Sequence, residues 1–507
     1  MVNLASAVAI CMLMALPTAC KGADNETDSV PPSRAGLTGP VGPVPRSCDG
    51  VVVDPSDNIQ SVIDAHPAGT TYCFSPGMYR LEQPLRPKEG DALIGRQGAV
   101  VSGARVLTGW QQHGNTWSTT GFLPTVPGNH GECLKSVLTC AYAEDVFLDK
   151  HRLTRVESPD AVTPGTVHAD YRANTITIGD DPRPHLVEQA VASSLVRATA
   201  DDVTVANLVL EQAANEAQVA AVESRQATPR ESGSGWRIHN NEVRGNHGAG
   251  LGLAGRAVVT ANFVHHQGQL GFGAWGTGSV VNSNEISFNG VAGYSPDWEA
   301  GGGKIWHTDS YTVTHNDVHD NLGPGLWTDG GNIRTEYSAN KITGNWGAGI
   351  QHEISYDATI RDNVISANGS RHKGWSWEAG IQIQSSGGTG LIEVAGNVVS
   401  GNANGIALIE SGHRTTEEPA PYGPHVVRNI LVHDNRVTMS TGQSTGAVQD
   451  IGDTAVFTGR NNRFEANTYY LPSLPEPHFF WNDTELTWAR WRALGNDVNG
   501  RAVRTTR

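Results

Sequence analysis

Short stretches of alternating hydrophobic and polar residues run along most of this chain, and from about residue 236 onward one pattern recurs. Each copy begins with an Asn, one further residue and an aliphatic or aromatic residue, and leads through Gly-x-Gly into a short alternating segment. The copies begin at Asn241, Asn262, Asn284, Asn316, Asn340, Asn363, Asn397, Asn435 and Asn462. Their shortest spacings are 21 to 24 residues, and four of the eight intervals are longer. This periodicity predicts a solenoid with a coil of about 22 residues, in which the longer intervals hold insertions.

The alternating segments predict strands, which excludes helical repeats, and the period is too short for a four-stranded propeller blade. Each coil is expected to supply three short strands that pair in parallel with the coils on either side, because a single coil cannot bury its own apolar side chains. The recurrent Asn fits a tight turn between two strands, where its side chain can bond the main chain and the neighbouring coils. A ladder of asparagines is therefore expected along the solenoid.

The start of the patterned region holds three recognisable segments, Asn58–Asp64, Ala68–Phe74 and Pro76–Arg80. Together with the coils, they resemble the capping helix and first coil of the pectate lyase superfamily of right-handed parallel β-helices. The resemblance covers roughly residues 48–107 and 195–470. It implies an all-β, single-stranded right-handed parallel β-helix. The superfamily includes pectinases, chondroitinase-like lyases, epimerases and glycosidases, so the resemblance implies the fold more strongly than the reaction.

Breaks in the pattern divide the chain. The predicted units are an N-terminal cap with the first coils at 47–107, a small inserted β subdomain at 108–195, the main β-helix at 196–472 and a C-terminal cap at 473–507. The last unit is expected to contain a capping helix, because apolar residues recur from Leu486 to Leu494 just before Gly495. Such a cap would cover the open β edge of the last coil.

The first residues indicate export. Residues 4–19 are apolar and are followed by Cys20 and a stretch rich in Asp, Ser and Pro. We interpret 1–20 as a signal peptide and 21–46 as a disordered linker, which predicts a secreted or cell-surface protein. Leu16–Cys20 resembles a bacterial lipobox, but the Leu lies one place too early and no Lys or Arg precedes it. A lipid on Cys20 stays an open alternative, and it is the one membrane contact we expect.

Charge and cysteine content bear on partners and compartment. A net charge of -15 without a cluster of Lys and Arg argues against nucleic acid as a partner. Four cysteines follow the apolar segment, an even number suited to an oxidising compartment. Pairing of neighbours, Cys48 with Cys73 and Cys133 with Cys140, is the simplest arrangement. A metal site is the less favoured alternative, because neither pair has His or Cys companions at ligand spacing.

Candidate chemistry comes from the strand that follows each Gly-x-Gly. Period-two alternation directs its first and third positions into the solenoid and its second and fourth positions outward. The outward positions of the middle coils hold Trp275, Trp306, Trp327, Asp329, Gln351, Glu353, Gln382 and Gln384. A plain solvated face would carry more Thr, Lys and Ser, whereas indole rings stack on sugar rings. These positions therefore predict a sugar-binding cleft.

Two carboxylates, Asp329 and Glu353, occupy equivalent outward positions in adjacent coils. Their backbones should therefore lie one strand spacing apart, about 4.8 Å. Carboxyl groups that close repel, so one of them should keep its proton to a higher pH, which suits an acid and a base at one site. Both the retaining and the inverting geometry of glycosidases stay open, because side-chain rotamers set the carboxyl separation. A calcium site or a structural pair is the alternative.

Two insertions carry the same tetrapeptide just before an aligned strand, Trp298–Gly301 and Trp377–Gly380. They are expected to wall the cleft, with Trp298 and Trp377 contacting the substrate or packing on the solenoid. Glu299 or Glu378 is then an alternative second carboxylate. Lys304 is expected to point outward near the same place.

The inward third positions of three successive coils are assigned to His307, Thr328 and His352. We interpret them as a hydrogen-bonded internal ladder that supports the site from within. If the strand bends there, His352 becomes a candidate acid or base.

Three functions fit these residues. The preferred one is a glycoside hydrolase with Asp329 and Glu353 as the catalytic pair and no cofactor. The second is a polysaccharide lyase or uronate epimerase with Lys304 or His352 as the base and a calcium ion. The outward face lacks the cluster of basic residues that a polyanion calls for. The third is a non-catalytic carbohydrate-binding solenoid. The partner is a polysaccharide or oligosaccharide in each case, and a monomer is expected.

Overall fold

The computed structural model describes residues 44, 48–225, 233–371, 376–412 and 422–505. The predicted signal peptide, Cys20 and nearly all of the predicted linker lie outside the described residues. None of the helices in the described residues is long and apolar enough to cross a membrane.

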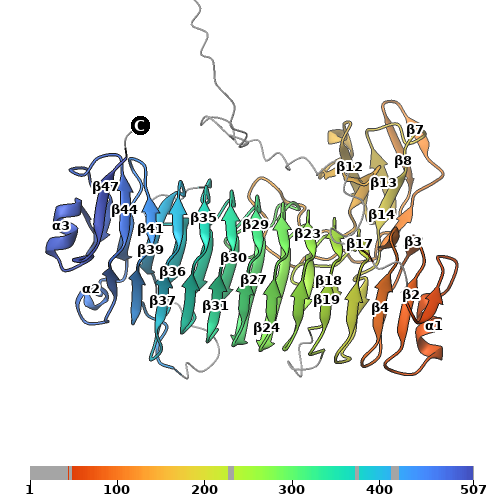
Figure 1. Ribbon diagram of the computed structural model, residues 1–507. Helices are drawn as coiled ribbons and strands as arrows, with labels where there is room; N and C mark the ends of the chain where they lie inside the picture. Colours follow the sequence, from red (N-terminus) through yellow and green to blue (C-terminus); the bar gives the residue numbers. More distant parts are fainter. Residues whose placement is uncertain (1–43, 45–47, 226–232, 372–375, 413–421, 506–507) are drawn as a thin grey trace, which may run out of the picture. The chain divides into compact units, whose positions relative to one another are not determined.

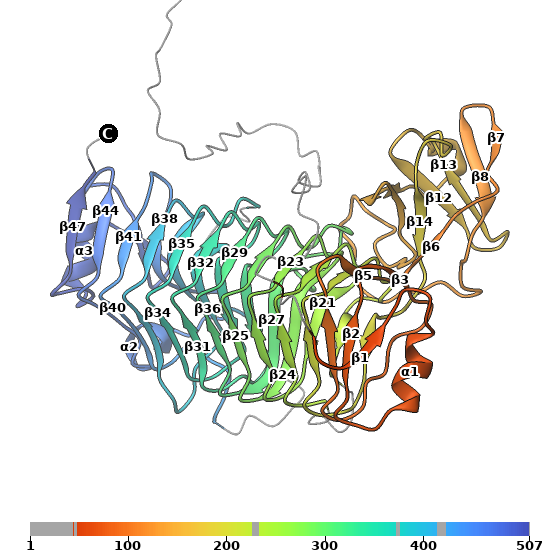
Figure 2. The same cartoon turned by 45° about the vertical axis from the view of Figure 1, so that its right-hand side comes forward.

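Three long sheets of mainly parallel strands, here called A, B and C, build the solenoid (Figures 1 and 2). Sheet A consists of β1 (Val51–Val53), β2 (Thr71–Phe74), β4 (Ala92–Gly95), β16 (Thr204–Ala206), β19 (Arg237–His239), β22 (Val258–Thr260), β25 (Val280–Asn282), β28 (Thr312–Thr314), β31 (Thr335–Ser338), β34 (Ala358–Arg361), β37 (Ile392–Ala395), β40 (Ile430–His433) and β43 (Arg463–Glu465). Sheet B consists of β3 (Gly77–Arg80), β5 (Ala99–Ser102), β17 (Val209–Glu211), β20 (Glu242–Arg244), β23 (Phe263–His265), β26 (Glu285–Ser287), β29 (Asp317–His319), β32 (Lys341–Thr343), β35 (Val364–Ser366), β38 (Val398–Ser400), β41 (Arg436–Thr438), β44 (Thr468–Leu471) and β47 (Arg501–Arg504). Sheet C consists of β15 (Val196–Arg197), β18 (Ala220–Glu223), β21 (Ala249–Leu253), β24 (Leu270–Thr277), β27 (Gly301–Asp309), β30 (Leu326–Asp329), β33 (Ile350–Glu353), β36 (Ala379–Gln384), β39 (Asn404–Glu410), β42 (Thr445–Gln449), β45 (Phe479–Trp481) and β46 (Thr484–Leu486). The predicted all-β solenoid is confirmed.

One hydrophobic core runs through the coils. In sheet C, for example, Leu251, Phe272, Leu326 and Ile350 are almost fully buried and pack in the same cluster. Alternation along each strand therefore directs one set of side chains into the solenoid and leaves the other set for chemistry.

The predicted asparagine ladder is confirmed from Asn241 to Asn435. Each side-chain oxygen accepts bonds from both the main-chain N–H and the side-chain amide of the preceding ladder residue. The last predicted member is wrong, because Asn435 bonds Asn467 rather than Asn462, and Asn467 in turn bonds Asp497. Residues just before ladder positions adopt left-handed backbone, for example Ala261 with a φ of 56°. This turn aligns each Asn with the ladder residue of the neighbouring coil.

A second ladder lies five residues further along each coil and was not predicted. It runs through Asn246, Gln267, Asn289, Asn321, Asn345, Asn368 and Asn402. The two ladders satisfy buried polar groups at turns of successive coils, where an unpaired group would cost about 1–3 kcal/mol.

Two smaller sheets occupy the segment that was predicted as an inserted subdomain. They contain β6 (Ala104–Val106), β9 (Val146–Leu148), β10 (His151–Arg152) and β14 (Val187–Ala190) in one sheet, and β7 (Gln111–His113), β8 (Thr116–Thr120), β11 (Thr154–Arg155), β12 (Thr166–Asp170) and β13 (Thr175–Ile178) in the other. A separate apolar cluster around Trp117 and Ile176 supports them. The predicted disulfides, Cys48 with Cys73 and Cys133 with Cys140, are both present.

The described residues also contain four short helices: α1 (Ile59–Ala65), η1 (Pro159–Ala161), α2 (Ala455–Thr458) and α3 (Trp488–Ala493). Helix α1 has the Asn58 side chain as its N-cap. Helix α3 is the predicted C-terminal helix, with Thr487 as its N-cap. Its Trp491 is fully buried against Phe464 and Phe479, which closes the apolar core at this end.

Candidate active site

The strand register of sheet C decides which side chains of the middle coils meet. Asp329 on β30 lies directly opposite Glu353 on β33, as the alternation predicted. Trp327 and Gln351 are opposite each other two residues earlier, and Lys304 on β27 lies opposite Trp327. A basic, an aromatic and two acidic side chains therefore occupy neighbouring outward positions.

The predicted alignment of β27 is wrong by two residues. Gly303, and not Ile305, lies opposite Leu326. The run of glycines that begins at Gly301 extends the strand, and a bulge interrupts its pairing with β24. A shift of two residues keeps Lys304, Ile305 and Trp306 on their predicted faces, because the side-chain period of a strand is two, but His307 at the bulge has left-handed backbone and is partly exposed. It nevertheless moves His307 out of the inward column, and Ile305 lies beside Thr328 instead.

Lys304 contacts two of the acidic side chains. Its Nζ lies 2.6 Å from Glu299 Oε1 and 2.9 Å from Asp329 Oδ2, and 4.2 Å from the ring centre of Trp327. Burial alone would lower the pKa of the Lys304 ammonium, but Asp329 and Glu299 outweigh it and hold this pKa above its ordinary value. Lys304 is thus a fixed positive charge, and it joins Glu299 from the first insertion to Asp329.

Glu353 and Asp329 have different surroundings. Glu353 is 2% exposed, and its Oε2 accepts hydrogen bonds from the Trp327 indole at 3.1 Å and the Gln351 amide at 2.7 Å. The Asp329 side chain is 21% exposed and has the Lys304 ammonium as its ion partner. Of the two carboxylates, Asp329 is the one that a molecule in solution can reach.

His352 lies inside the solenoid beneath this pair and has no exposed surface. Its Nε2 lies 2.9 Å from the Tyr356 carbonyl oxygen, which can only accept, so Nε2 carries the proton and Nδ1 accepts from the Thr328 hydroxyl at 2.7 Å. Burial lowers the pKa of His352 to about 4, although the bond to Tyr356 opposes the shift. A neutral imidazole is therefore held between two strands.

Trp275 and Trp306 continue the face toward the N-terminal coils. Their rings meet edge to face at 5.5 Å, and both rings lie close to the Arg225 guanidinium, at 5.3 and 5.2 Å. Arg225 is held by two hydrogen bonds of 2.8 Å to the carboxylate of Glu223. Both tryptophans are partly exposed, so they form an aromatic platform beside the carboxylates.

Arg225 and Glu223 were missed because their coil lacks the Gly-x-Gly pattern. A signal was nevertheless present in two adjacent outward glycines. A side chain at Gly252 would collide with the Glu223 carboxylate, and one at Gly273 would lie 2.6 Å from Arg225 Nη1. Consecutive glycines on an outer face indicate that another group lies across them.

The two insertions contact one another through an ion pair between Arg371 and Asp297, with distances of 2.8 and 3.1 Å. The tryptophans of both insertions pack against apolar clusters of the protein. Trp298 joins the cluster around Cys140, and Trp377 packs against the cluster of sheet C apolar residues that includes Ala407.

The later coils carry amides instead of charges. The Glu378 main-chain N–H donates to Gln382, the Gln382 amide donates to Gln384 at 3.2 Å, and Gln384 donates to Ser411. These side chains are nearly fully buried. Glu378 therefore lies one coil beyond Glu353, next to a chain of amides, whereas Glu299 contacts the basic residue of the site, Lys304.

His425, which no strand pattern could indicate, lies on the loop before β40. It is 7% exposed, its Nε2 lies 3.3 Å from the Tyr356 hydroxyl, and its Nδ1 is buried without a hydrogen-bond partner in the described residues. Burial lowers the pKa of His425, while the charge of Asp329 opposes that shift. The His425 ring is therefore close enough to Asp329, the carboxylate open to solvent, for the charge of Asp329 to act on it.

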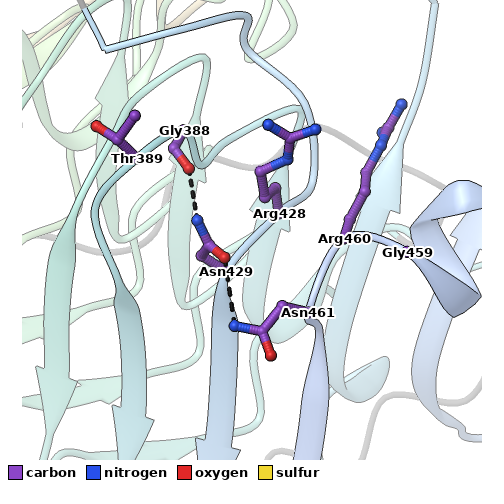
Figure 3. Close-up of a pocket in the computed structure, with 7 residues that line it drawn as sticks. All are labelled: Gly388, Thr389, Arg428, Asn429, Gly459, Arg460 and Asn461. Atoms are coloured by element: carbon purple, nitrogen blue, oxygen red, sulfur yellow. Dashed lines mark hydrogen bonds between the residues drawn. The ribbon is translucent and has the colours of Figure 1, made fainter.

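A pocket of about 370 Å³ lies elsewhere, at the turns before β37, β40 and β43 (Figure 3). It is lined by Gly388, Thr389, Arg428, Asn429, Gly459, Arg460 and Asn461. Arg460 is already paired with Glu410 and Asp453. Across the described ranges, no three His, Cys, Asp or Glu side chains converge as a metal site would need.

Comparison with known proteins places the fold. The family model described as right handed beta helix region matches residues 230–339 and 334–418. XylC, solved in complex with xylose, is similar over 78% of this chain and 83% of its own, with a TM-score of 0.57 and 16% identity. A mannuronan C-5 epimerase module from Azotobacter vinelandii covers 89% of this chain and 94% of its own at a TM-score of 0.49 and 14% identity, and a glycoside hydrolase covers 77% and 91% at 0.42 and 10%. No curated protein matches the chain by sequence. The chain has a right-handed parallel β-helix fold, as its sequence implied.

Proposed function

We propose that this right-handed parallel β-helix is a glycoside hydrolase that cleaves a polysaccharide on the outer face of β27, β30 and β33. The observation that carries the proposal is the register of Asp329 opposite Glu353, which sets two carboxylates with different surroundings side by side. Glycoside hydrolysis needs such a pair, one to protonate the leaving oxygen and one to attack the sugar or activate water.

The surroundings suggest how the two carboxylates share this work. Asp329 is open to solvent and can approach the scissile bond, whereas Glu353 is oriented by two neutral N–H donors. Lys304 supplies a permanent positive charge next to Asp329. A charge held in place before the reaction stabilises developing negative charge without reorganisation.

Sugar binding is supported by the aromatic platform. The partly exposed rings of Trp306 and Trp275 lie one and two strands away from Asp329 and offer apolar faces for sugar stacking. XylC, which shares the fold, is described in complex with xylose.

The lyase or epimerase alternative receives less support. It requires a neutral base, and Lys304 is held as an ammonium between two carboxylates. His352 is neutral but lies inside the solenoid with both ring nitrogens engaged. The position of His352 favours a role in supporting the strands. The two disulfides suit a protein that functions in an oxidising compartment outside the cytoplasm.

The test is incubation with a panel of polysaccharides, following new reducing ends and the absorbance of unsaturated uronates. Reducing ends without that absorbance are expected. Asp329→Asn and Glu353→Gln should each lower the rate at least about 1,000-fold while the fold is kept. Asp317→Asn is the matched control, because Asp317 pairs with Lys341 on sheet B and should leave the rate unchanged. Full activity in both site variants, or an unsaturated product, contradicts the proposal.

A further inference from the structure

The charged groups on the proposed active face are arranged in an unusual way, since its basic side chains are already occupied. Two basic residues, Arg225 and Lys304, project onto the described part of the face. Arg225 is clamped by Glu223, and Lys304 bridges Glu299 and Asp329. Their side chains are 3% and 8% exposed, so neither cation is presented to solvent.

The ends of the face repeat the same arrangement. Arg334 is paired with Asp309, the last residue of β27, and Arg371 is paired with Asp297 on the first insertion. Each of these guanidiniums already has a carboxylate partner, although the Arg334 side chain is 52% exposed and the Arg371 side chain 23%.

Among the described residues, the face is also acidic. Four carboxylates, those of Glu223, Glu299, Asp329 and Glu353, stand against the two buried cations, so these six groups carry a net formal charge of minus two. Like charges brought together at a binding face disfavour a partner strongly. In the part of the chain that the structure describes, the groups open to a ligand besides the Asp329 carboxylate are the tryptophan rings and the Gln351 amide, which suit uncharged hydroxyl-rich rings.

We propose that the substrate is an uncharged polysaccharide, and that the paired charges of this face exclude polyanionic glycans. This rests on the proposed hydrolase function, but it concerns binding and can be tested separately from cleavage.

The first experiment is affinity electrophoresis of the full chain in gels that contain either neutral glycans (xylan, arabinan, mannan, β-glucan) or anionic ones (polygalacturonate, alginate, hyaluronate). Retention by at least one neutral glycan is expected, with little change as ionic strength rises. Anionic glycans should bind at least about tenfold more weakly. Equal or stronger retention by an anionic glycan, or retention by no neutral glycan, overturns the inference.

The two proposals fail in different ways. If an anionic glycan yields reducing ends without unsaturated product, the hydrolase stands and the inference about charge falls. If a neutral glycan is retained but never cleaved, the inference stands and the hydrolase falls. A chitosan gel adds a positively charged glycan, and retention there in preference to every neutral glycan also overturns the inference.

A variant makes the test sharper. Glu223→Gln leaves the Arg225 guanidinium without its carboxylate, and it should raise the affinity for an anionic glycan at least about tenfold. Glu465→Gln is the matched control, because it removes the same charge near Arg463 on sheet A and should change nothing. If Glu223→Gln does not fold, Gln351→Lys adds a cation at a partly exposed position of the face and carries the same expectation. Unchanged affinity in a folded variant contradicts the inference.

Discussion

The first asparagine ladder and the outer face of sheet C are both columns of side chains in register, but they differ in kind. Along the ladder, one residue type recurs in coil after coil from Asn241 to Asn467. Along the face, the residue changes at every coil, from Gly273 to Lys304, Trp327 and Gln351. Repetition serves the stacking of coils, and departure from repetition marks the place of the proposed active site.

The two columns also differ in their energetics. In the ladder, each buried amide from Asn241 to Asn435 is satisfied by a neighbour of the same kind, and a carboxylate, Asp497, takes part only at the end of the ladder. In the face, Lys304 and Glu299 are buried and Asp329 is partly buried, and removing such groups from water often costs more than their mutual attraction returns. A structure that needed only stability would not use them, which is why their removal should separate function from folding.

Removing the buried cation should have the largest effect. Lys304→Met leaves Glu299 and Asp329 without their ion partner, and we expect a loss of about 3–5 kcal/mol of stability together with nearly all activity. The double variant Glu299→Leu/Lys304→Met should recover much of the stability but none of the activity. Chemical denaturation and reducing-end assays measure the two quantities. Lys341→Met, which removes an exposed pair with Asp317, is the control. An active double variant would show that this network is merely structural.

The ladder and the Asp329–Glu353 register could be predicted from the sequence because both depend on short-range periodicity. The alignment of β27 could not, because glycines from Gly301 onward permit two registers that keep the same faces. Asn462 was taken for the ladder in place of Asn467 because irregular coil spacing near the C-terminal end hides the turn. Arg225 and His425 lie outside the repeated pattern, so only three-dimensional packing brings them to the site.

Breaking the ladder should affect stability and leave chemistry alone. Asn316→Ala removes bonds to Asn284 and Asn340 and leaves the Val281 carbonyl without its donor. We expect about 3 kcal/mol of lost stability, since several buried polar groups lose their partners together. Activity per folded molecule should stay the same. Asn282→Ala, at a less buried position of the preceding coil, is the control. A large loss of activity in the folded Asn316 variant would remove the distinction between the two columns.

The buried imidazole beneath the face should make stability depend on pH. Because the pKa of His352 is lowered to about 4, the unfolded chain binds the proton more readily, and stability should fall as pH drops from about 6.5 to about 4. The full effect is on the order of 3 kcal/mol, and His352→Gln should flatten the curve in this range. His319 is the opposite case, since burial is outweighed by Asp320 and Glu285 and its pKa rises to about 9. His319→Gln should therefore change the curve between about 6.5 and 9 instead, and urea unfolding across both ranges distinguishes them.

The smallest effect is expected at the aromatic platform. Trp306→Ala removes a partly exposed ring that contacts Trp275 and Arg225, and the fold should tolerate this because the ring lies outside the core. Loss of one stacking surface should raise KM about tenfold, which corresponds to about 1.4 kcal/mol, and leave kcat nearly unchanged. Trp346→Ala, at a partly exposed turn after β32, is the matched control and should leave KM as it is. Since the platform lies on the same face as Asp329 but takes no part in the bond-breaking step, a selective change in KM is what a binding role requires. A fall in kcat without a change in KM would mean instead that Trp306 acts by holding Arg225 and the adjoining strand in place.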